Sequence, residues 1–243
     1  MAISNVVGSN IFNLMVVCGA CAVFAPLAVK ENTLKKEFPL SIIAAILLWA
    51  MGNQGMSIGR ADGILLLLVF AAFLMWMVLE AMKARSSAQE EELVPLKSWL
   101  CVVYIAVGIG ANVAGGEFVV DSATAIDEDF GLSPSLIGLT IVAFGTSLPE
   151  LVTSLVAARK GETDMALGNV IGSNIFNILL VLGVAGAVSP MEVLMENLID
   201  DIILIGMSGV VWIFAWRRKQ ISRIHGALML AMYAGYTAYI CMR

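Results

Sequence analysis

The chain has 243 residues, of which 60% are hydrophobic and 14% charged, with a net charge of -5 and a mean hydropathy of +0.91. A soluble domain carries about 25% charged residues, and a water-soluble fold of this length could not bury so much apolar surface. The composition therefore excludes a soluble enzyme, a nucleic-acid-binding protein and a disordered segment. It indicates an integral membrane protein, whose partner is the lipid bilayer. The cysteines lie inside apolar runs, so we expect free thiols that pack as small apolar side chains: Cys18, Cys21, Cys101 and Cys241.

The apolar runs predict eight membrane-spanning helices, since a helix needs about 20 apolar residues to cross about 30 Å of hydrocarbon. Long runs that contain glycine, without a ten-residue alternation, favour a helix bundle over a β-barrel. The predicted fold is an all-α polytopic membrane helix bundle. Its spans, in chain order, are Met1–Val29, Phe38–Gly59, Gly63–Leu79, Ser98–Gly116, Phe130–Ala158, Thr163–Met191, Ile202–Trp216 and Gly226–Met242.

The basic residues predict the orientation of this bundle. With eight spans, 12 of the 14 Lys and Arg residues fall on one side of the membrane, and only Arg60 and Arg243 fall on the other. Cytoplasmic loops carry the excess of basic residues. We therefore expect a multi-pass protein of the cell (inner) membrane with both visible chain ends outside.

The sequence contains a copy of itself. Met1–Val29 and Met165–Val193, 164 residues apart, share 14 identities in 29 aligned positions without a gap. Both copies hold the polar string G-S-N-I-F-N, at 8–13 and 172–177. The offset contains five spans, an odd number, so equivalent helices should cross the membrane in opposite directions. Many secondary transporters have such an inverted repeat and bind their substrates where the two halves meet.

A second motif interrupts the fifth predicted span. It reads G-T-S-L-P-E at 145–150, and Pro149 should break or kink the helix because it lacks an N–H and clashes with the preceding turn. That change would free backbone carbonyls around Ala143. Glu150 is the one carboxylate deep within a predicted span, and it lies one helical turn after Thr146 and close to Ser147. An ionisable residue at such a depth usually faces a cavity, a partner or an ion pathway, although a structural Glu between helices is an alternative.

The repeated string places a hydroxyl and an amide one turn apart in each copy. These are Ser9 with Asn13, and Ser173 with Asn177. Either pair alone would be typical of helix–helix packing, but two symmetry-related pairs together with Glu150 favour ion binding. Hydroxyl, amide, carbonyl and carboxylate oxygens are hard ligands that suit Ca²⁺ and Na⁺. The sequence thus indicates a transported alkali or alkaline-earth cation.

These motifs carry a family resemblance. The segments 145–150 and 168–177 resemble the second α-repeat of the cation/calcium exchanger superfamily, in its sodium/calcium exchanger branch of prokaryotic type, and 4–13 resembles the latter half of the first α-repeat. The resemblance implies ten helices in two inverted halves, of which the eight spans would be the third to the tenth. It implies exchange of Ca²⁺ for Na⁺, with H⁺ or K⁺ involved in some branches, by alternating access.

The resemblance also implies a division of the chain and a set of ion ligands. Residues 1–85 would form an incomplete first repeat, 86–97 a cytoplasmic linker and 98–243 a complete second repeat. Two further spans, about 70 residues, would precede Met1 by the repeat offset, and the first-repeat counterpart of 145–150 does not occur in the sequence. The implied ion-binding residues are Glu150 as a central carboxylate, Thr146, Ser147 and the Ala143 carbonyl on the same helix, Ser173 and Asn177 opposite, and Ser9 and Asn13 from the first half.

The sequence therefore predicts an antiporter that exchanges Ca²⁺ for Na⁺, without a bound cofactor and without enzymatic activity. One alternative is a H⁺/Ca²⁺ antiporter. Some relatives carry Asp where Asn177 stands, and the asparagine removes one titratable group, which leaves the ion stoichiometry and proton coupling open. Another is an inactive truncated fragment that serves only as a helical scaffold. The oligomeric state stays open.

Overall fold

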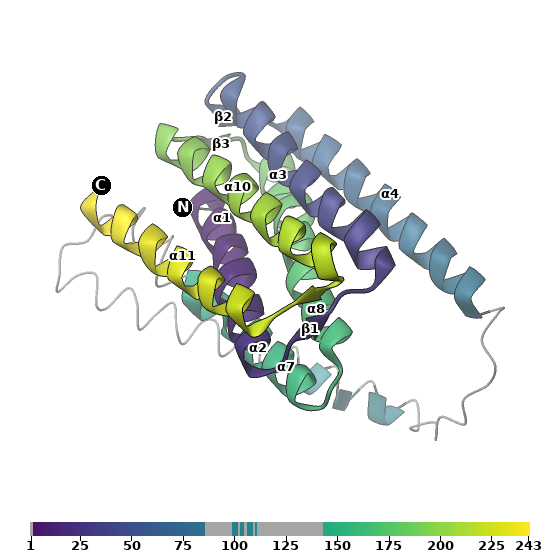
Figure 1. The fold of residues 1–243 in the computed structure, drawn as a ribbon. Helices are drawn as coiled ribbons and strands as arrows, with labels where there is room; N and C mark the ends of the chain where they lie inside the picture. Colours follow the sequence, from purple (N-terminus) through teal and green to yellow (C-terminus); the bar gives the residue numbers. More distant parts are fainter. Residues whose placement is uncertain (1, 86–98, 102, 105, 109, 111–142) are drawn as a thin grey trace.

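The computed structural model describes residues 2–85, 99–101, 103, 104, 106–108, 110 and 143–243. Within them the chain is almost wholly helical, with four short strands (Figure 1). The α-helices are α1 (Ala2–Phe12), α2 (Cys18–Phe24), α3 (Phe38–Asn53), α4 (Arg60–Arg85), α7 (Ala143–Arg159), α8 (Thr163–Phe176), α9 (Gly183–Val188), α10 (Met195–Arg218) and α11 (Arg223–Met242). The strands are β1 (Leu27–Ala28), β2 (Ser57–Ile58), β3 (Met191–Glu192) and β4 (Gln220–Ile221).

Among the described residues, three π-helical segments adjoin the α-helices. Segment η1 (Asn13–Val17) joins α1 to α2, and η4 (Asn177–Leu182) joins α8 to α9. Segment η2 (Thr33–Glu37) leads into α3. The segments η1 and η4 begin at Asn13 and Asn177, which are equivalent positions of the repeat. π-Helical turns are rare and often lie at functional sites. Their recurrence at these two asparagines therefore indicates that the repeated motif is part of a functional site.

Four helical stretches among the described residues are long and apolar enough to cross a membrane. They are Ala2–Phe24, Arg60–Lys83, Thr163–Val188 and Met195–Arg218. These match the first, third, sixth and seventh predicted spans, and α3 and α11 occupy the second and the eighth. The prediction for the fourth span, and for residues 130–142 of the fifth, falls largely or wholly outside the described residues.

Two predicted span boundaries are wrong, because helices continue through carboxylates that were expected to lie outside them. Helix α10 begins at Met195 and so includes Asp200 and Asp201, and α4 includes Glu80. Two of these acids have cationic partners that tertiary structure supplies. Lys36 is 2.6 Å from Glu80, and Arg243 contacts both oxygens of Asp200 at 3.1 Å.

The inverted repeat is visible in the strand pairing. Strand β1 pairs antiparallel with β4, and β2 pairs antiparallel with β3. Strand β3 follows β1 by 164 residues, and β4 follows β2 by 163, so β3 and β4 are the second-half equivalents of β1 and β2. Each pair therefore joins one strand from each half, and the two pairs are equivalent to each other under the repeat. The two pairs lie at opposite ends of the bundle (Figure 1). The motif helices of the two halves therefore run in opposite directions, as the odd number of intervening spans predicts.

Close helix contacts obey the same symmetry. A Cβ atom added to Gly226 of α11 would lie 2.5 Å from the Gly19 carbonyl oxygen of α2, and one added to Gly63 of α4 would lie 2.7 Å from the Gly183 carbonyl oxygen of α9. Gly63 and Gly226 are equivalent, as are Gly19 and Gly183. Small residues let the backbones of membrane helices approach each other closely. Such a glycine contact occurs at two equivalent places in this repeat.

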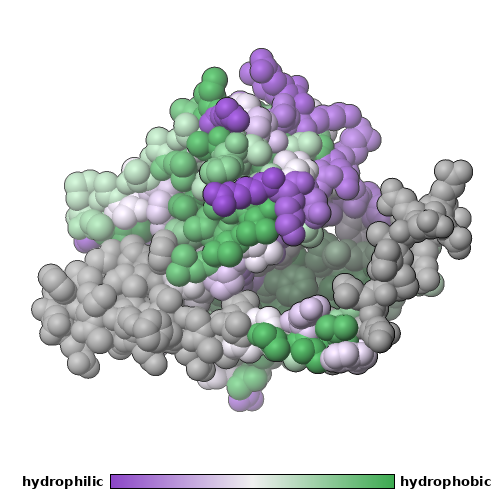
Figure 2. Space-filling view, turned by 90° about the horizontal axis from the view of Figure 1, so that it is seen from below, coloured by the Kyte–Doolittle hydropathy of each residue, from purple (hydrophilic) through white to green (hydrophobic). Residues whose placement is uncertain are grey.

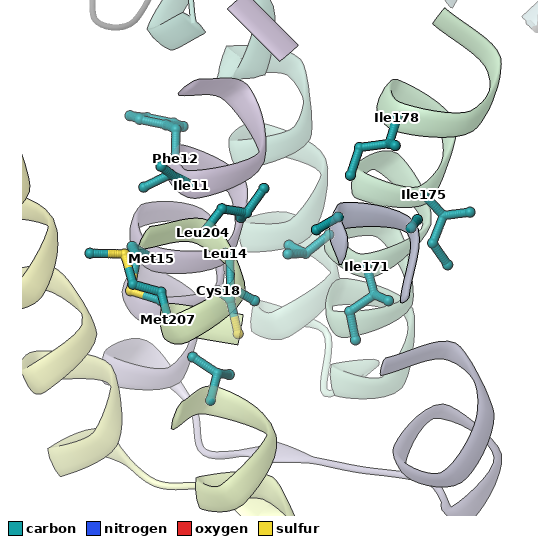
Figure 3. Close-up of a cluster of buried hydrophobic side chains, with 14 of the residues drawn as sticks. Ile11, Phe12, Leu14, Met15, Cys18, Ile171, Ile175, Ile178, Leu204 and Met207 are labelled. Carbon is teal, nitrogen blue, oxygen red and sulfur yellow. The ribbon is translucent and has the colours of Figure 1, made fainter. Parts of the chain in front are cut away.

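The buried core lies along the two motif helices. Figure 3 shows side chains of the first copy, among them Leu14 and Met15, beside Leu204 and Met207 of α10, with Ile171 and Ile175 of α8 nearby. The central and outer helices differ in burial. In the central stretch Ala2–Phe24, 83% of the most apolar window is buried, whereas in the outer stretch Arg60–Lys83 only 17% is buried. Apolar side chains cover wide areas of the surface (Figure 2). Such a surface suits contact with lipid acyl chains rather than with water.

Both described chain ends lie at one end of the bundle. Ser4 accepts a 2.8 Å hydrogen bond from Asn197 near the start of α10, and Arg243 contacts Asp200 one turn further along. At the opposite end, Lys30 pairs with Asp164 at 2.8 Å and Lys36 with Glu80. The described chain ends therefore lie at the same end of the bundle, and Lys30 and Lys36 lie at the other.

Candidate ion-binding site

Helix α7 carries the G-T-S-L-P-E motif. It is α-helical from Ala143 to Arg159 with Pro149 inside it, so the predicted break of the backbone helix does not occur. The proline still has no N–H, and the carbonyl four residues earlier, that of Gly145, loses its normal donor. Ala143 stands in the first turn of this helix. The role of its carbonyl oxygen as a ligand stays a prediction.

One cavity brings together five of the predicted site residues. It has a volume of ≈ 230 Å³ and lies between α1, α7 and η4. Ser9 comes from the first half of the chain, and the other four come from the second half. The oxygen-bearing side chains that line this cavity are Asn5, Ser9, Thr146, Ser147, Glu150 and Asn177.

Direct contacts tie the walls of this cavity together. The Ser9 Oγ and Thr146 Oγ1 atoms are 3.0 Å apart, which joins α1 to α7. Asn177 donates through Nδ2 to Asn10 Oδ1 at 3.0 Å, which joins η4 to α1. The Asn177 Oδ1 atom is then the oxygen that this amide can turn toward an ion.

A second, more open hollow adjoins the first along α8. It has a volume of ≈ 470 Å³ and shares Glu150 and Asn177 with the smaller cavity. Ser173 lines this hollow with its side chain close enough to hydrogen-bond the Glu150 carboxylate. Asn169 fixes the position of α8 against α7, because its Nδ2 donates to Ser154 Oγ at 3.0 Å. Glu150 is thus the carboxylate common to both spaces.

Two of the predicted ligands have buried polar atoms without a partner. Among the residues the structure describes, neither Glu150 Oε2 nor the side-chain oxygen and nitrogen of Asn13 has a hydrogen-bond partner. Burying an unsatisfied polar group is costly, and burying an unpaired charge more so. Asn13 is 1% exposed and begins η1, but it does not line the two spaces described above. The structure therefore places Asn13 beside the cavity rather than on its wall.

Two asparagines of the repeated string were missed as site residues. Asn10 Nδ2 donates to the Asn174 carbonyl at 3.2 Å, and Asn174 Nδ2 donates to the Asn10 carbonyl at 3.1 Å. This reciprocal pair lies where the two motif helices cross, and Asn10 also receives Asn177. The asparagine that ends each G-S-N string was a usable signal. Its role in joining the copies depends on the crossing, which the sequence alone does not give.

The structure also corrects the expectation that Glu150 is the one carboxylate deep within a span. Asp200 and Asp201 are 0% and 2% exposed within α10. Asp200 is paired with Arg243, whereas neither oxygen of Asp201 has a hydrogen-bond partner among the described residues. In the same part of the chain, no three His, Cys, Asp or Glu residues form a metal-binding group. The candidate site is accordingly rich in neutral oxygens, with Glu150 as its carboxylate.

We expect Arg243→Gln to lower the thermal stability of the purified protein substantially, because it leaves the buried Asp200 carboxylate without its cation. Breaking a buried ion pair costs about 3–5 kcal/mol. The double variant Arg243→Gln/Asp200→Asn should recover part of this loss. Thermal unfolding monitored by fluorescence-detected size exclusion would measure both, and equal stability of the wild type and the single variant would contradict the assigned pairing.

The fold and this site together define a class of protein, namely a helical membrane transporter built from an inverted repeat, with its candidate site where the halves cross. The model of the sodium/calcium exchanger protein family matches residues 1–79 and 100–242. The chain belongs to that family, whose members are transporters rather than enzymes.

Individual relatives agree with this assignment. The chain is 38% identical to the putative antiporter CaxA of Alkalimonas amylolytica, over 97% of this chain and 76% of that one. It is 33% identical to the inner membrane protein YrbG of Escherichia coli, over 100% and 76%. Among solved structures, the sodium-calcium exchanger NCX_Mj soaked with Na⁺ and Sr²⁺ superposes with a TM-score of 0.77, at 35% identity, over 98% of this chain and 76% of that one.

Proposed function

We propose that this protein is a secondary active antiporter that exchanges Ca²⁺ for Na⁺ across the membrane by alternating access. The observation that carries the proposal is the cavity in which Ser9 of one half meets Thr146, Ser147, Glu150 and Asn177 of the other. Exchange of these ions is named in similar proteins, such as the sodium/calcium exchanger MaX1 of Methanosarcina acetivorans, which is 38% identical over 54% of this chain and 38% of that one.

The donor set suits these ions chemically. Ca²⁺ takes 6–8 oxygen ligands from carboxylates, carbonyls, amides and water, and Na⁺ is also a hard cation that prefers oxygen. The described lining of the cavity offers hydroxyl groups, amides and one carboxylate, and it contains no thiol or imidazole. Soft transition metals would favour those absent groups. We propose Glu150, Thr146, Ser147, Ser173, Asn177 and Ser9 as side-chain ligands, with Asn13 and the Ala143 carbonyl completing the set.

The same carboxylate explains why transport would be an exchange. Ca²⁺ or several Na⁺ ions can neutralise it in turn, whereas an empty site would leave the Glu150 charge uncompensated in a low-dielectric interior. The crossing between inward-facing and outward-facing states is then favourable only for an occupied site. If the cycle moves net charge, each charge contributes about 2.3 kcal/mol per 100 mV of membrane potential.

The two copies of the motif differ in burial beside the candidate site. In the first copy Phe12 and Val17 are 2% and 0% exposed, but their equivalents Phe176 and Val181 are 40% and 48% exposed beside Glu150. In the described part of the chain, α7 covers the first copy, and no equivalent helix covers the second. Among the described residues, the second copy is therefore the more open of the two beside Glu150.

The coupling ion can be tested by replacement. We expect Ca²⁺ uptake into proteoliposomes loaded with Na⁺ to fall to background when internal Na⁺ is replaced by choline at constant pH and constant membrane potential. The physical reason is that Asn177 cannot release a proton, which leaves few titratable groups in the site. Uptake that survives in choline and follows an imposed pH gradient would favour the H⁺/Ca²⁺ alternative instead.

We also propose the inner cell membrane as the location, with both described ends outside. The lysine-rich end of the bundle supports this orientation, because basic residues accumulate on the cytoplasmic side. The division into 1–85, 86–97 and 98–243 is likewise a proposal, supported by the repeat. An impermeant thiol reagent should label a cysteine introduced at Glu192 in intact cells and should not label one introduced at Lys35.

A further inference from the structure

A basic hollow lies at the lysine-rich end of the bundle, away from the ion cavity. It has a volume of ≈ 510 Å³ and is formed where the chain turns from α10 into α11. Its polar rim is made by Arg217, Arg218, Ser222 and His225, and its apolar wall by Ile213, Phe214 and Ile224. A hollow with a charged rim and an apolar wall suits an amphiphilic ligand better than a soluble ion.

The two arginines on this rim have no acidic partner in the described part of the chain. The ion pairs found there leave out Arg217 and Arg218, although the next residue, Lys219, contacts Glu31 at 2.9 Å. None of the described residues that line the hollow is a carboxylate. The local field is therefore positive and uncompensated. Arginine binds phosphate through a planar fork of N–H donors. Because no carboxylate of the described rim occupies these donors, they are available to a phosphate.

The turn between the two helices fixes a further donor. His225 Nδ1 accepts from the Ser222 backbone N–H at 3.3 Å, while Ser222 Oγ accepts from the His225 N–H at 3.4 Å and caps α11. In a neutral ring whose Nδ1 accepts, the proton is on Nε2. The ring also stacks on Phe214, with centroids 4.4 Å apart and planes 9° apart. The imidazole is thus held rigidly, with an N–H as its remaining polar group.

The position of the hollow relates it to the bilayer surface. It lies at the end of the membrane-spanning stretch Met195–Arg218, on the basic side. Ile213 and Ile224 on its wall are 55% and 73% exposed, so they would meet acyl chains while the arginines meet the headgroup layer. Basic pockets between helices on the cytoplasmic side bind anionic lipid headgroups.

We infer that this hollow is a binding site for an anionic phospholipid of the cytoplasmic leaflet, with its phosphate between Arg217 and Arg218 and its acyl chains along Ile213 and Ile224. The site is separate from the ion cavity and does not depend on which ions the protein exchanges. Zwitterionic lipids should bind there more weakly, because their headgroup amine offsets the phosphate charge.

Native mass spectrometry of the purified full chain in a neutral detergent tests this inference, with phosphatidylglycerol and phosphatidylcholine as probes. We expect retention of phosphatidylglycerol over phosphatidylcholine, and a loss on the order of 10-fold in the variant Arg217→Gln/Arg218→Gln. The matched control Arg159→Gln/Lys160→Gln removes the same charge from the exposed end of α7 and should keep wild-type binding.

A third variant examines the apolar wall while keeping every charge. Ile224→Ser should weaken phosphatidylglycerol binding without altering the binding of soluble glycerol phosphate. Equal losses of phosphatidylglycerol binding in the Arg217→Gln/Arg218→Gln and Arg159→Gln/Lys160→Gln variants would overturn the inference, since they would indicate general charge attraction. Equal retention of the two lipids, or glycerol phosphate that binds as tightly as the lipid, would overturn it as well.

Discussion

Glu150→Gln is expected to abolish Na⁺-dependent Ca²⁺ exchange while leaving insertion and folding intact. Gln has nearly the same size as Glu but lacks the charge that neutralises a divalent ion, and Glu150 is the carboxylate shared by both spaces of the candidate site. Replacing a residue that hydrogen-bonds to a metal ligand typically lowers metal affinity or activity by about 10–100-fold, so loss of a charged direct ligand should lower the exchange rate by at least about 100-fold. Radioactive Ca²⁺ uptake into proteoliposomes, made from protein expressed from its whole reading frame, measures this.

The matched control for this experiment is Glu192→Gln. It makes the same chemical change at an exposed residue of β3, far from the cavity, and should transport at the wild-type rate. Vigorous Ca²⁺ uptake by the Glu150→Gln variant would rule out its proposed role. If the wild-type protein itself shows no uptake under every ionic condition, the inactive-scaffold alternative gains support.

Gly226→Ala is expected to destabilise the bundle by about 3 kcal/mol or more, at the upper end of typical overpacking costs. The new Cβ would lie 2.5 Å from the Gly19 carbonyl oxygen and 2.9 Å from the Val23 nitrogen. Both obstacles are backbone atoms, so α2 and α11 would have to separate. The melting temperature in detergent should fall by several degrees, and the equivalent change Gly63→Ala should act in the same direction.

A control for this prediction lies on the same helix. Gly235 of α11 has no atom within 4 Å of an added Cβ, so Gly235→Ala introduces the same methyl group without a collision. Alanine is favoured over glycine within a helix by about 1 kcal/mol, and this variant should melt at or slightly above the wild-type temperature. A similar fall for Gly226→Ala and Gly235→Ala would show that helix propensity, rather than the close contact, determines the effect.

Much of the site was predictable because its residues stand out chemically against an apolar background. Glu150, Thr146 and Ser147 are polar groups in a span, and Ser9, Ser173 and Asn177 lie in a string that occurs twice. The structure brings Ser9, Thr146, Ser147, Glu150 and Asn177 to one cavity and Ser173 to the adjoining hollow. Their role as ligands remains a prediction, as do those of Asn13 and Ala143.

The parts that escaped prediction depend on contacts between distant segments. Asp200 lies inside α10 and contacts Arg243, which is 43 residues away, so a rule that ends spans at charged residues places the boundary wrongly. The pairing of Asn10 with Asn174 depends on how two helices cross. The π-helical turns at Asn13 and Asn177 also had no signal in the hydropathy pattern.

The sequence by itself determined the membrane class, the helical secondary structure and the inverted relation of the two halves, because these depend on composition, on the length of apolar runs and on an odd number of spans between copies. Only the tertiary structure decided which polar side chains share a cavity, which buried acids have a cation and which glycines allow backbone contact. Those properties depend on the crossing and separation of helices far apart in the chain. Packing against partners fixes that geometry, and no local pattern encodes it.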